Sequence, residues 1–335
     1  MSDTMEGLRR RIDGAGELEG VVRSMKALAA SSIGQYEKAV QSLDDYYRTV
    51  ELALVACFRQ AASVPFAVGP PISNKGAIGV VIFGSDQGLV GRFNEVIVEF
   101  AVHALGALPG KTTKIWAVGD RVHALVADAG LAPVGLLSVP TSVDAITPLV
   151  GQILIEIQAA LEHSDVGEVY LFHNHPKLGA VYEPINKQLL PLDHAWQSKL
   201  AAMSWPTNHL PEVIEAAPSA LQAFVRGYLF VLLFQACAES LASENASRLA
   251  AMQRAEKNIS DILEDLNRTL HRVRQESIDE ELFDVIAGFE ALTAQGAPHP
   301  RNLARRTSNG LAILEQNNTD CVFPHEDTVC NESME

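Results

Sequence analysis

The first candidate for chemistry is a glycine-rich turn, GSDQGLVG at residues 84–91, which directly follows an apolar run at residues 76–83. Backbone amides that are exposed where a strand turns into a helix can bind a phosphate group. However, Gly84, Gly88 and Gly91 lack the spacing of a dinucleotide fingerprint, and one such turn is a weak signal. The spacing favours a structural turn in which the backbone passes close to a neighbour and glycine avoids a clash.

Two further patterns suggest a site, and neither is convincing. The GKT at residues 110–112 follows Gly106, which is one residue too close for a phosphate loop, and it leads into a strand rather than a helix. His173 and His175 alternate on a strand and could share one face, but the sequence shows no third ligand, so ordinary polar residues at a strand end are the favoured interpretation. No nucleophile elbow and no Ser-His or Cys-His pair can be argued. We therefore predict no catalytic, cofactor-binding or metal-binding residues and no cofactor.

Composition excludes several classes of protein. The formal net charge of -15 argues against a nucleic-acid binder, because such binding rests on a basic face that neutralises phosphates. The four cysteines are too few and too scattered for a disulfide framework, which favours a reducing compartment. The N-terminus is polar and charged, unlike a signal peptide.

Residues 296–335 are predicted to form a disordered acidic tail. The tail has no Lys or Arg after Arg306, and it contains Cys321 and Cys330. Disorder is favoured over a redox switch built from these two cysteines, because the segment is too polar to bury a core.

Strands and helices alternate in the centre of the chain, over residues 76–200. The continuous apolar run at 76–83 predicts a strand that is covered on both faces. The remaining elements are predicted from apolar runs and from caps such as Thr147 followed by Pro148. They are strands at 114–119, 134–139, 168–174 and 180–192, and helices at 94–105, 120–130 and 147–162. This order predicts a Rossmann-like α/β domain with a largely parallel sheet.

The last third of the chain carries a long helical pattern. Residues 239–292 contain no Pro, and a seven-residue repeat is followed by a phase slip after which the apolar stripe continues. The repeat consists of Met252, Ile259, Leu266 and Val273, and the continuation of Ile278, Leu282, Val285, Phe289 and Leu292. A stripe of this length is typical of a coiled-coil seam. The preceding run YLFVLLF at 228–234 is too short to span a bilayer and is interpreted as buried helix.

The N-terminal segment carries a matching stripe. One heptad position is occupied by Leu8, Ala15, Val22, Ala29, Tyr36, Leu43, Val50 and Cys57, and the companion position by Leu18, Met25, Ala39, Tyr46 and Ala53. Two long seams at opposite ends of one chain predict an antiparallel coiled coil that brackets the α/β domain. We assign residues 1–62 and 212–295 to its two helices, and expect residues 22–50 to run antiparallel to part of residues 252–292.

Three blocks of sequence carry a resemblance to a known family. They are LRRRI with RSMKALAAS at residues 8–12 and 23–31, SDQGLVGRFN at 85–94, and ESLASENASRLAAM with HRVRQESIDEEL at 239–252 and 271–282. In order and spacing they resemble the gamma subunit of F-type ATP synthases, over residues ~5–292. Val90 stands where that family usually has Cys, and Asn245 where His is common. Such departures are similar to those of the alternate F-type ATPase of some prokaryotes, which leaves the coupling ion open between proton and sodium.

The resemblance implies a central rotor stalk that couples ion translocation through the membrane sector to ATP synthesis or hydrolysis. It implies alpha and beta subunits of the catalytic hexamer, the epsilon subunit and the c-subunit ring as partners, and a peripheral location on the cytoplasmic face of a prokaryotic plasma membrane. It assigns contacts with the hexamer to Met25, Lys26, Arg272, Arg274 and Gln275. The family's turn maps onto Ser85, Asp86, Gly88 and Gly91. Catalysis would then belong to the partner subunits, and this chain would bind no nucleic acid.

Two other functions remain open on the residues alone. A nucleotide-binding α/β enzyme that dimerises through its helices explains the glycine-rich turn, but not the Arg-x-Arg-Gln block at residues 272–275. A cytosolic coiled-coil scaffold explains the helices, but not the inserted sheet.

Overall fold

The computed structural model describes residues 4–60, 77–108, 112–163, 166–177, 180–192, 194–209 and 217–295. The predicted tail with Cys321 and Cys330, and Gly110 and Lys111 of the GKT pattern, lie outside these residues. The chain divides into two compact units, residues 1–275 and 276–335. Except where residues 276–295 are named, the description below concerns the first unit.

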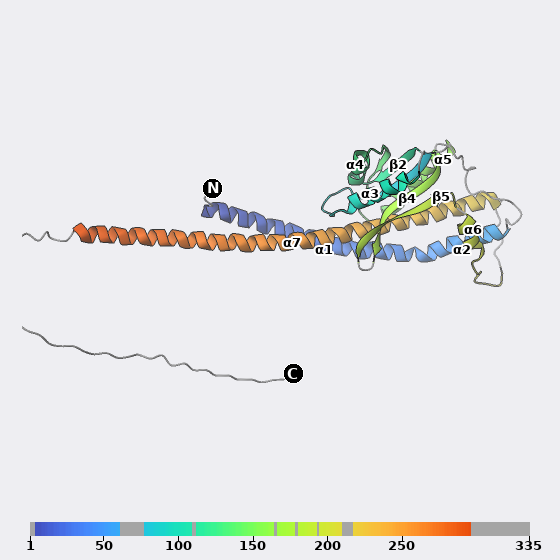
Figure 1. Ribbon diagram of the computed structural model, residues 1–335. Coiled ribbons are helices and arrows are strands. Elements are labelled where there is room, and N and C mark those ends of the chain that lie inside the picture. The colour runs from blue at the N-terminus through green and yellow to red at the C-terminus, as the bar shows by residue number, and fades with distance from the viewer. Residues whose placement is uncertain are drawn as a thin grey trace, which may run out of the picture. The chain divides into compact units, whose positions relative to one another are not determined.

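The centre of the chain forms a five-stranded sheet, and the helices α3, α4 and α5 connect its first four strands along the chain (Figure 1). The strands lie in the order β3-β2-β1-β4-β5, in which β1 to β4 are parallel and β5 is antiparallel to β4. In chain order the elements are β1 (Ala77–Phe83), α3 (Phe93–Gly106), β2 (Thr113–Val118), α4 (Asp120–Asp128), β3 (Pro133–Leu137), α5 (Ile146–Glu162), β4 (Val166–Lys177) and β5 (Ala180–Leu190). The predicted α/β fold with a largely parallel sheet is confirmed.

The start of α5 differs from the prediction. The helix begins at Ile146 after Ala145, which makes no side-chain capping bond. Thr147 therefore lies inside the first turn and is not the cap. The helix starts one residue before Thr147, at Ile146, whose side chain is fully buried. Shifts of one or two residues at a helix end are common.

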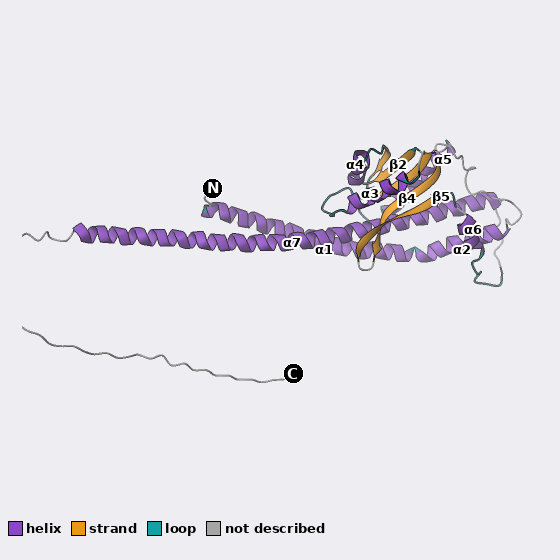
Figure 2. Ribbon diagram, in the orientation of Figure 1, coloured by secondary structure: helices purple, strands orange, loops and turns teal. Residues whose placement is uncertain are grey.

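Two apolar cores cover the two faces of the sheet. Side chains alternate between faces along a strand, so Ile78, Val80 and Ile82 of β1 pack with α3 and α4, while Val81 and Phe83 face the other way. The second core also contains α5 and the long helices from the two ends of the chain. The sheet is thus held between a pair of helices and the helical shaft (Figure 2).

The shaft is formed by helices from both ends of the chain. These are α1 (Met5–Ser42), α2 (Asp44–Gln60) and α7 (Ala217–Gln295), with the short α6 (His194–Ala201) packed beside α2. Thr4 caps α1 by accepting a hydrogen bond from Gly7 N at 3.3 Å. The single N-terminal helix that the sequence predicts is interrupted at Leu43, where α1 ends.

Contacts between the two ends establish an antiparallel arrangement. Lys26 Nζ lies 2.5 Å from Glu256 Oε2, and the ring centroids of Tyr47 and Tyr228 are 5.8 Å apart. As residue numbers rise along α1 and α2, those of the partners on α7 fall. The predicted antiparallel pair of chain ends is confirmed.

The register of the pair differs from our expectation. Residues 26–47 lie opposite residues 228–256, so most of their partners precede the expected range of 252–292. The reason is that the run YLFVLLF and the heptad repeat belong to one continuous helix, which begins at Ala217. That run is buried, as predicted. By length and composition α7 could cross a membrane, but 56% of its most apolar window is buried inside the protein, which is typical of a core helix.

The heptad pattern correctly predicts most of the N-terminal seam. The buried members of its main position are Leu8, Val22, Ala29, Tyr36, Val50 and Cys57. In the companion position Leu18 and Tyr46 are exposed, so the prediction is wrong there. The seam is narrower than a full two-position stripe.

In the second unit, the described residues 276–295 complete α7. The apolar side chains that continue the stripe, Ile278, Leu282, Val285, Phe289 and Leu292, are each more than half exposed. Among the described residues, this part of the stripe is not buried.

Candidate functional site

The glycine-rich turn after β1 is held by hydrogen bonds within the chain. Asn94 Oδ1 accepts from Ser85 N at 2.9 Å, and Asn94 Nδ2 donates to Ser85 Oγ at 2.8 Å. A Cβ on Gly84 would lie 2.5 Å from Cβ of Val122, so only glycine fits there. Gly91 has φ of +59°, which glycine adopts readily. A Cβ on Gly88 would meet only the flexible Arg121 side chain, at 3.4 Å.

Asp86 links the turn to two other segments of the α/β domain. Its Oδ1 accepts from Asp120 N, in the first turn of α4, at 3.0 Å, and its Oδ2 accepts from Val139 N at 3.0 Å. A carboxylate at a helix N-terminus is favoured by the positive end of the helix dipole. The turn is therefore joined to the start of α4 and to the segment after β3.

Replacing Asp86 with alanine is expected to lower the free energy of unfolding by about 2 kcal/mol, because two charge-assisted hydrogen bonds to backbone amides are lost. Urea denaturation followed by circular dichroism measures the change. Asp128→Ala is the control, since Asp128 is the exposed last residue of α4. A change of less than about 0.5 kcal/mol for both variants would contradict this account of the turn.

The same turn is attached to the shaft. Ser247 Oγ donates to Val90 O at 2.5 Å, and Ser243 Oγ donates to Asn174 O at 3.1 Å. Asn174 Nδ2 in turn donates to Phe93 O at 3.0 Å. Each of these polar groups is buried, where a hydrogen bond lost from one partner leaves the other unsatisfied. We call the contact of the turn and β4 with residues 239–254 of α7 the junction.

A buried ion pair lies within the junction. Arg248 Nη2 is 2.6 Å from Glu244 Oε1, and their side chains are only 14% and 7% exposed. Burial raises the pKa of Glu244, an effect that Arg248 opposes without cancelling. Breaking a buried pair leaves an uncompensated charge, so both partners are required together.

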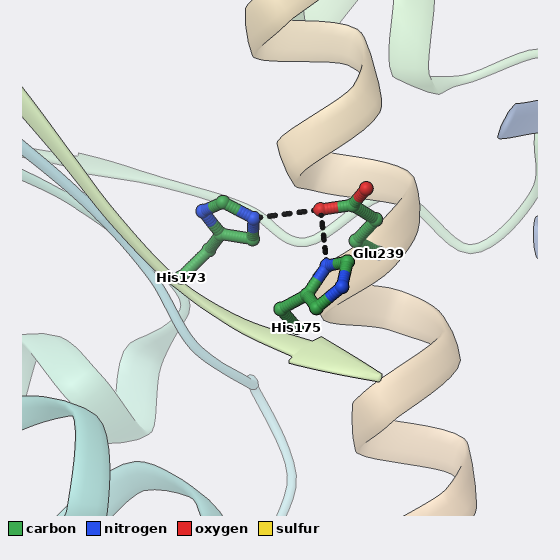
Figure 3. A group of neighbouring side chains, drawn as sticks. All are labelled: His173, His175 and Glu239. Carbon is green, nitrogen blue, oxygen red and sulfur yellow. Dashed lines mark hydrogen bonds and ion pairs between the residues drawn. The ribbon is translucent and has the colours of Figure 1, made fainter. Parts of the chain in front are cut away.

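A second buried polar group contains both candidate histidines. His173 Nε2 lies 2.8 Å from Glu239 Oε2, and His175 Nδ1 lies 3.0 Å from the same oxygen (Figure 3). Burial would raise the pKa of Glu239, but its interactions with His173 and His175 outweigh this effect and lower the pKa to about 2. Burial lowers the pKa of His173, an effect that Glu239 opposes. Glu239 is thus a third candidate ligand beside the two histidines, which the sequence did not show.

The α7 side of the junction lies in the block ESLASENASRLAAM at residues 239–252. Glu239, Ser243 and Ser247 follow one another at intervals of four residues, which places them on one face of α7. Polar residues at that interval are usually a solvated helix face, and only the structure shows that these three are buried.

The predicted partner contacts lie along the shaft and do not come together. Met25 and Lys26 are half-buried on α1, and Lys26 lies against Glu256, whose pKa is lowered by this hydrogen bond. Arg272, Arg274 and Gln275 are exposed on α7. Arg272 takes part in an interaction within the chain. Exposure leaves Arg274 and Gln275 accessible to another subunit, and their role stays a prediction.

Comparisons with known proteins agree on one family. A family model described as ATP synthase matches residues 4–292. The ATP synthase gamma chain of Lachnoclostridium phytofermentans is 26% identical over 86% of this chain and 99% of the relative. That of Salinibacter ruber is 28% identical over 87% of this chain and 99% of the relative. The chain belongs to the ATP synthase gamma-chain family. It is therefore a subunit of a membrane-bound ATP synthase complex.

Solved structures share the fold of the chain. The rotor of the Euglena gracilis mitochondrial ATP synthase contains a chain with a TM-score of 0.56 and 16% identity, covering 83% of this chain and all of that one. A second structure of that enzyme, with OSCP, F1 and the c-ring, gives a TM-score of 0.62 and covers 91% of this chain. The expected architecture, a helical shaft with an inserted α/β domain, is therefore a fold that both of these ATP synthase structures contain.

Proposed function

We propose that the chain is the central rotor stalk of an F-type ATP synthase, in which it couples ion translocation through the membrane sector to ATP synthesis or hydrolysis in a hexamer of alpha and beta subunits. The observation that carries this proposal is the antiparallel pairing of the two chain ends around an inserted α/β domain, together with membership of the family. A shaft must resist unwinding. A buried apolar seam provides that resistance, because separating its helices exposes apolar surface at ~25 cal/mol per Å².

The partners follow from the parts of the chain. We assign the shaft to the alpha and beta subunits of the hexamer, and the α/β domain to the epsilon subunit and the c-subunit ring. The exposed apolar stripe of residues 278–292 supports the first assignment, because large apolar side chains exposed together favour burial against a partner. This assembly would place the chain peripherally, on the cytoplasmic face of a prokaryotic plasma membrane.

The chain itself would be non-catalytic. The hydrogen bonds of Ser85 and Asp86 within the chain, and the positive φ of Gly91, support a structural role for the turn that contains Ser85, Asp86, Gly88 and Gly91. Nucleotide chemistry is assigned to the partner subunits. The alternative, a nucleotide-binding enzyme, would need a phosphate to bind at a turn whose Ser85 amide already donates to Asn94 Oδ1.

Reconstitution tests the proposal. The full chain, mixed with purified alpha and beta subunits of its own organism, is expected to form a complex that hydrolyses ATP continuously in a coupled assay. The chain alone should neither hydrolyse ATP nor bind it tightly. Saturable micromolar ATP binding by the isolated chain, abolished by Gly91→Val, would instead support the enzyme. Failure of the chain to associate with the hexamer would contradict the rotor assignment.

A further inference from the structure

We propose that His173, His175 and Glu239 form a binding site for a divalent transition metal, and that zinc is the cation that fits it best. Two imidazole nitrogens and one carboxylate oxygen are a donor set that zinc takes in proteins. Mg²⁺ and Ca²⁺ prefer sites made of oxygen atoms, so two histidines argue against them. The site is separate from the turn and from the predicted partner contacts.

The donor atoms are already close to the required geometry. All three lie within 4.8 Å of one another, and the two His–Glu separations are 2.8 and 3.0 Å. Zinc bonds of 2.0–2.2 Å in a tetrahedral site set neighbouring donors about 3.3 Å apart. A metal ion therefore requires each imidazole to move away from Glu239 by roughly half an ångström or less, and the two imidazole nitrogens, which lie within 4.8 Å of each other, to settle about 3.3 Å apart.

Two rigid elements present these donors. His173 and His175 are two residues apart on β4, so both point to the same face of the sheet, toward α7 (Figure 3). His173 and His175 pair with Ile185 and Glu183 of β5, and the preceding residue Phe172 is the last of β4 to pair with β1. Glu239 is oriented by Gln235, whose Nε2 donates to Oε1 at 2.8 Å and leaves Oε2 for the histidines. Outer hydrogen bonds of this kind hold metal ligands in place.

Burial and access also fit a metal site. The His173 and Glu239 side chains are 0% and 6% exposed, whereas His175 is 41% exposed and gives an ion a route from solvent. The buried His175 Nδ1 has the Glu239 carboxylate oxygen beside it at 3.0 Å, without the alignment of a good hydrogen bond. Coordination would satisfy this nitrogen. A water molecule on the exposed side would complete the four ligands of zinc.

A bound metal would fasten the α/β domain to the shaft. Two ligands belong to a strand of the domain and the third to α7, so the ion would cross-link the junction. The competing interpretation is a hydrogen-bonded His–Glu–His group that holds no metal. The positive charge of Lys187 favours this interpretation, because it disfavours a further positive charge at His173 and lowers the pKa of that residue. Zinc binding by the folded chain decides between the two.

The experiment uses the full chain carrying Cys321→Ser and Cys330→Ser, which removes tail thiolates that could bind zinc by themselves. After treatment with chelator, titration calorimetry is expected to show one zinc per chain with a dissociation constant of micromolar or below. Zinc at about 100 times this constant should raise the melting temperature by about 5–10 °C, and magnesium should not. Cobalt(II) should give the visible absorption of a site with four or five ligands.

Variants place the ion. His175→Asn and Glu239→Gln should each weaken zinc binding at least tenfold, whereas His103→Asn, at an exposed histidine of α3, should not change it. His175→Asn is the safer variant, because its side chain is partly exposed and the fold does not depend on it. The proposal is overturned if the folded chain shows no saturable zinc binding, or if His175→Asn and Glu239→Gln bind zinc as tightly as the parent chain.

Discussion

Replacing Gly119 with alanine is expected to destabilise the α/β domain by about 3–5 kcal/mol, the largest stability effect that we expect from a single substitution in this chain. Gly119 precedes α4 with φ of +118°, a conformation that residues with a Cβ rarely adopt. A Cβ there would lie 2.7 Å from Ser85 O, which is a backbone atom held by the turn. Strain and overlap therefore add, and the turn that carries Asp86 would have to move.

A matched control separates the two causes. Gly130 also has a positive φ, of +79°, but a Cβ at that position would meet nothing within 4 Å. Gly130→Ala should therefore show the conformational strain alone, about 1 kcal/mol. Thermal and urea denaturation of both variants measure the difference. Equal destabilisation of the two would mean that the close approach of Gly119 to Ser85 does not contribute.

Replacing Arg274 and Gln275 together with alanine is expected to lower ATP turnover of the reconstituted complex by roughly 10- to 100-fold. Both side chains are exposed in this chain. The family resemblance implies that they contact a loop of a catalytic beta subunit. Charge-assisted hydrogen bonds from Arg to a carboxylate contribute about 1.5–3 kcal/mol when they are shielded from water. The isolated chain should stay folded, because neither residue belongs to the buried seam.

The control for this variant is Asn267→Ala with Arg268→Ala on the same helix. Arg268 is 66% exposed and pairs with Glu264 and Asp265 within the chain, so its loss should affect only local ion pairs. Turnover and assembly are measured for both double variants with the same alpha and beta subunits. Parent-like turnover by the Arg274 and Gln275 variant would identify these side chains as solvated helix charges and end their assignment as a contact site.

The sequence predicted the fold well because its signals were long. Heptads at both ends gave the antiparallel shaft, and the continuous apolar strands gave the sheet. The predicted register was wrong because the heptad repeat is recognisable only from Met252 onward. The helix α7 starts at Ala217, and its most apolar segment, which is buried, precedes that repeat. Periodicity locates a face of a helix, but the choice of partner depends on where both helices begin.

The junction was less predictable from the sequence. His173 and His175 were noticed, but Glu239 lies 66 residues from His173 along the chain, and only the packing of β4 on α7 brings them together. The structural role of Asp86 could not be predicted for the same reason. Its carboxylate oxygens accept hydrogen bonds from backbone amides of α4 and of the segment after β3, which are distant in the sequence. Local patterns cannot show which distant groups satisfy a buried charge.

The pairing of the two chain ends has a consequence for synthesis of the protein. Lys26 and Glu256 are 230 residues apart, so the N-terminal helices emerge from the ribosome long before their partner. At ~5–20 residues per second, the apolar seam of α1 remains without α7 for roughly 10–50 s. The sheet, whose neighbouring elements are closer in sequence, can form during that interval. The shaft is therefore the last part to close, and the newly made N-terminal helices are the segment most in need of protection by a chaperone.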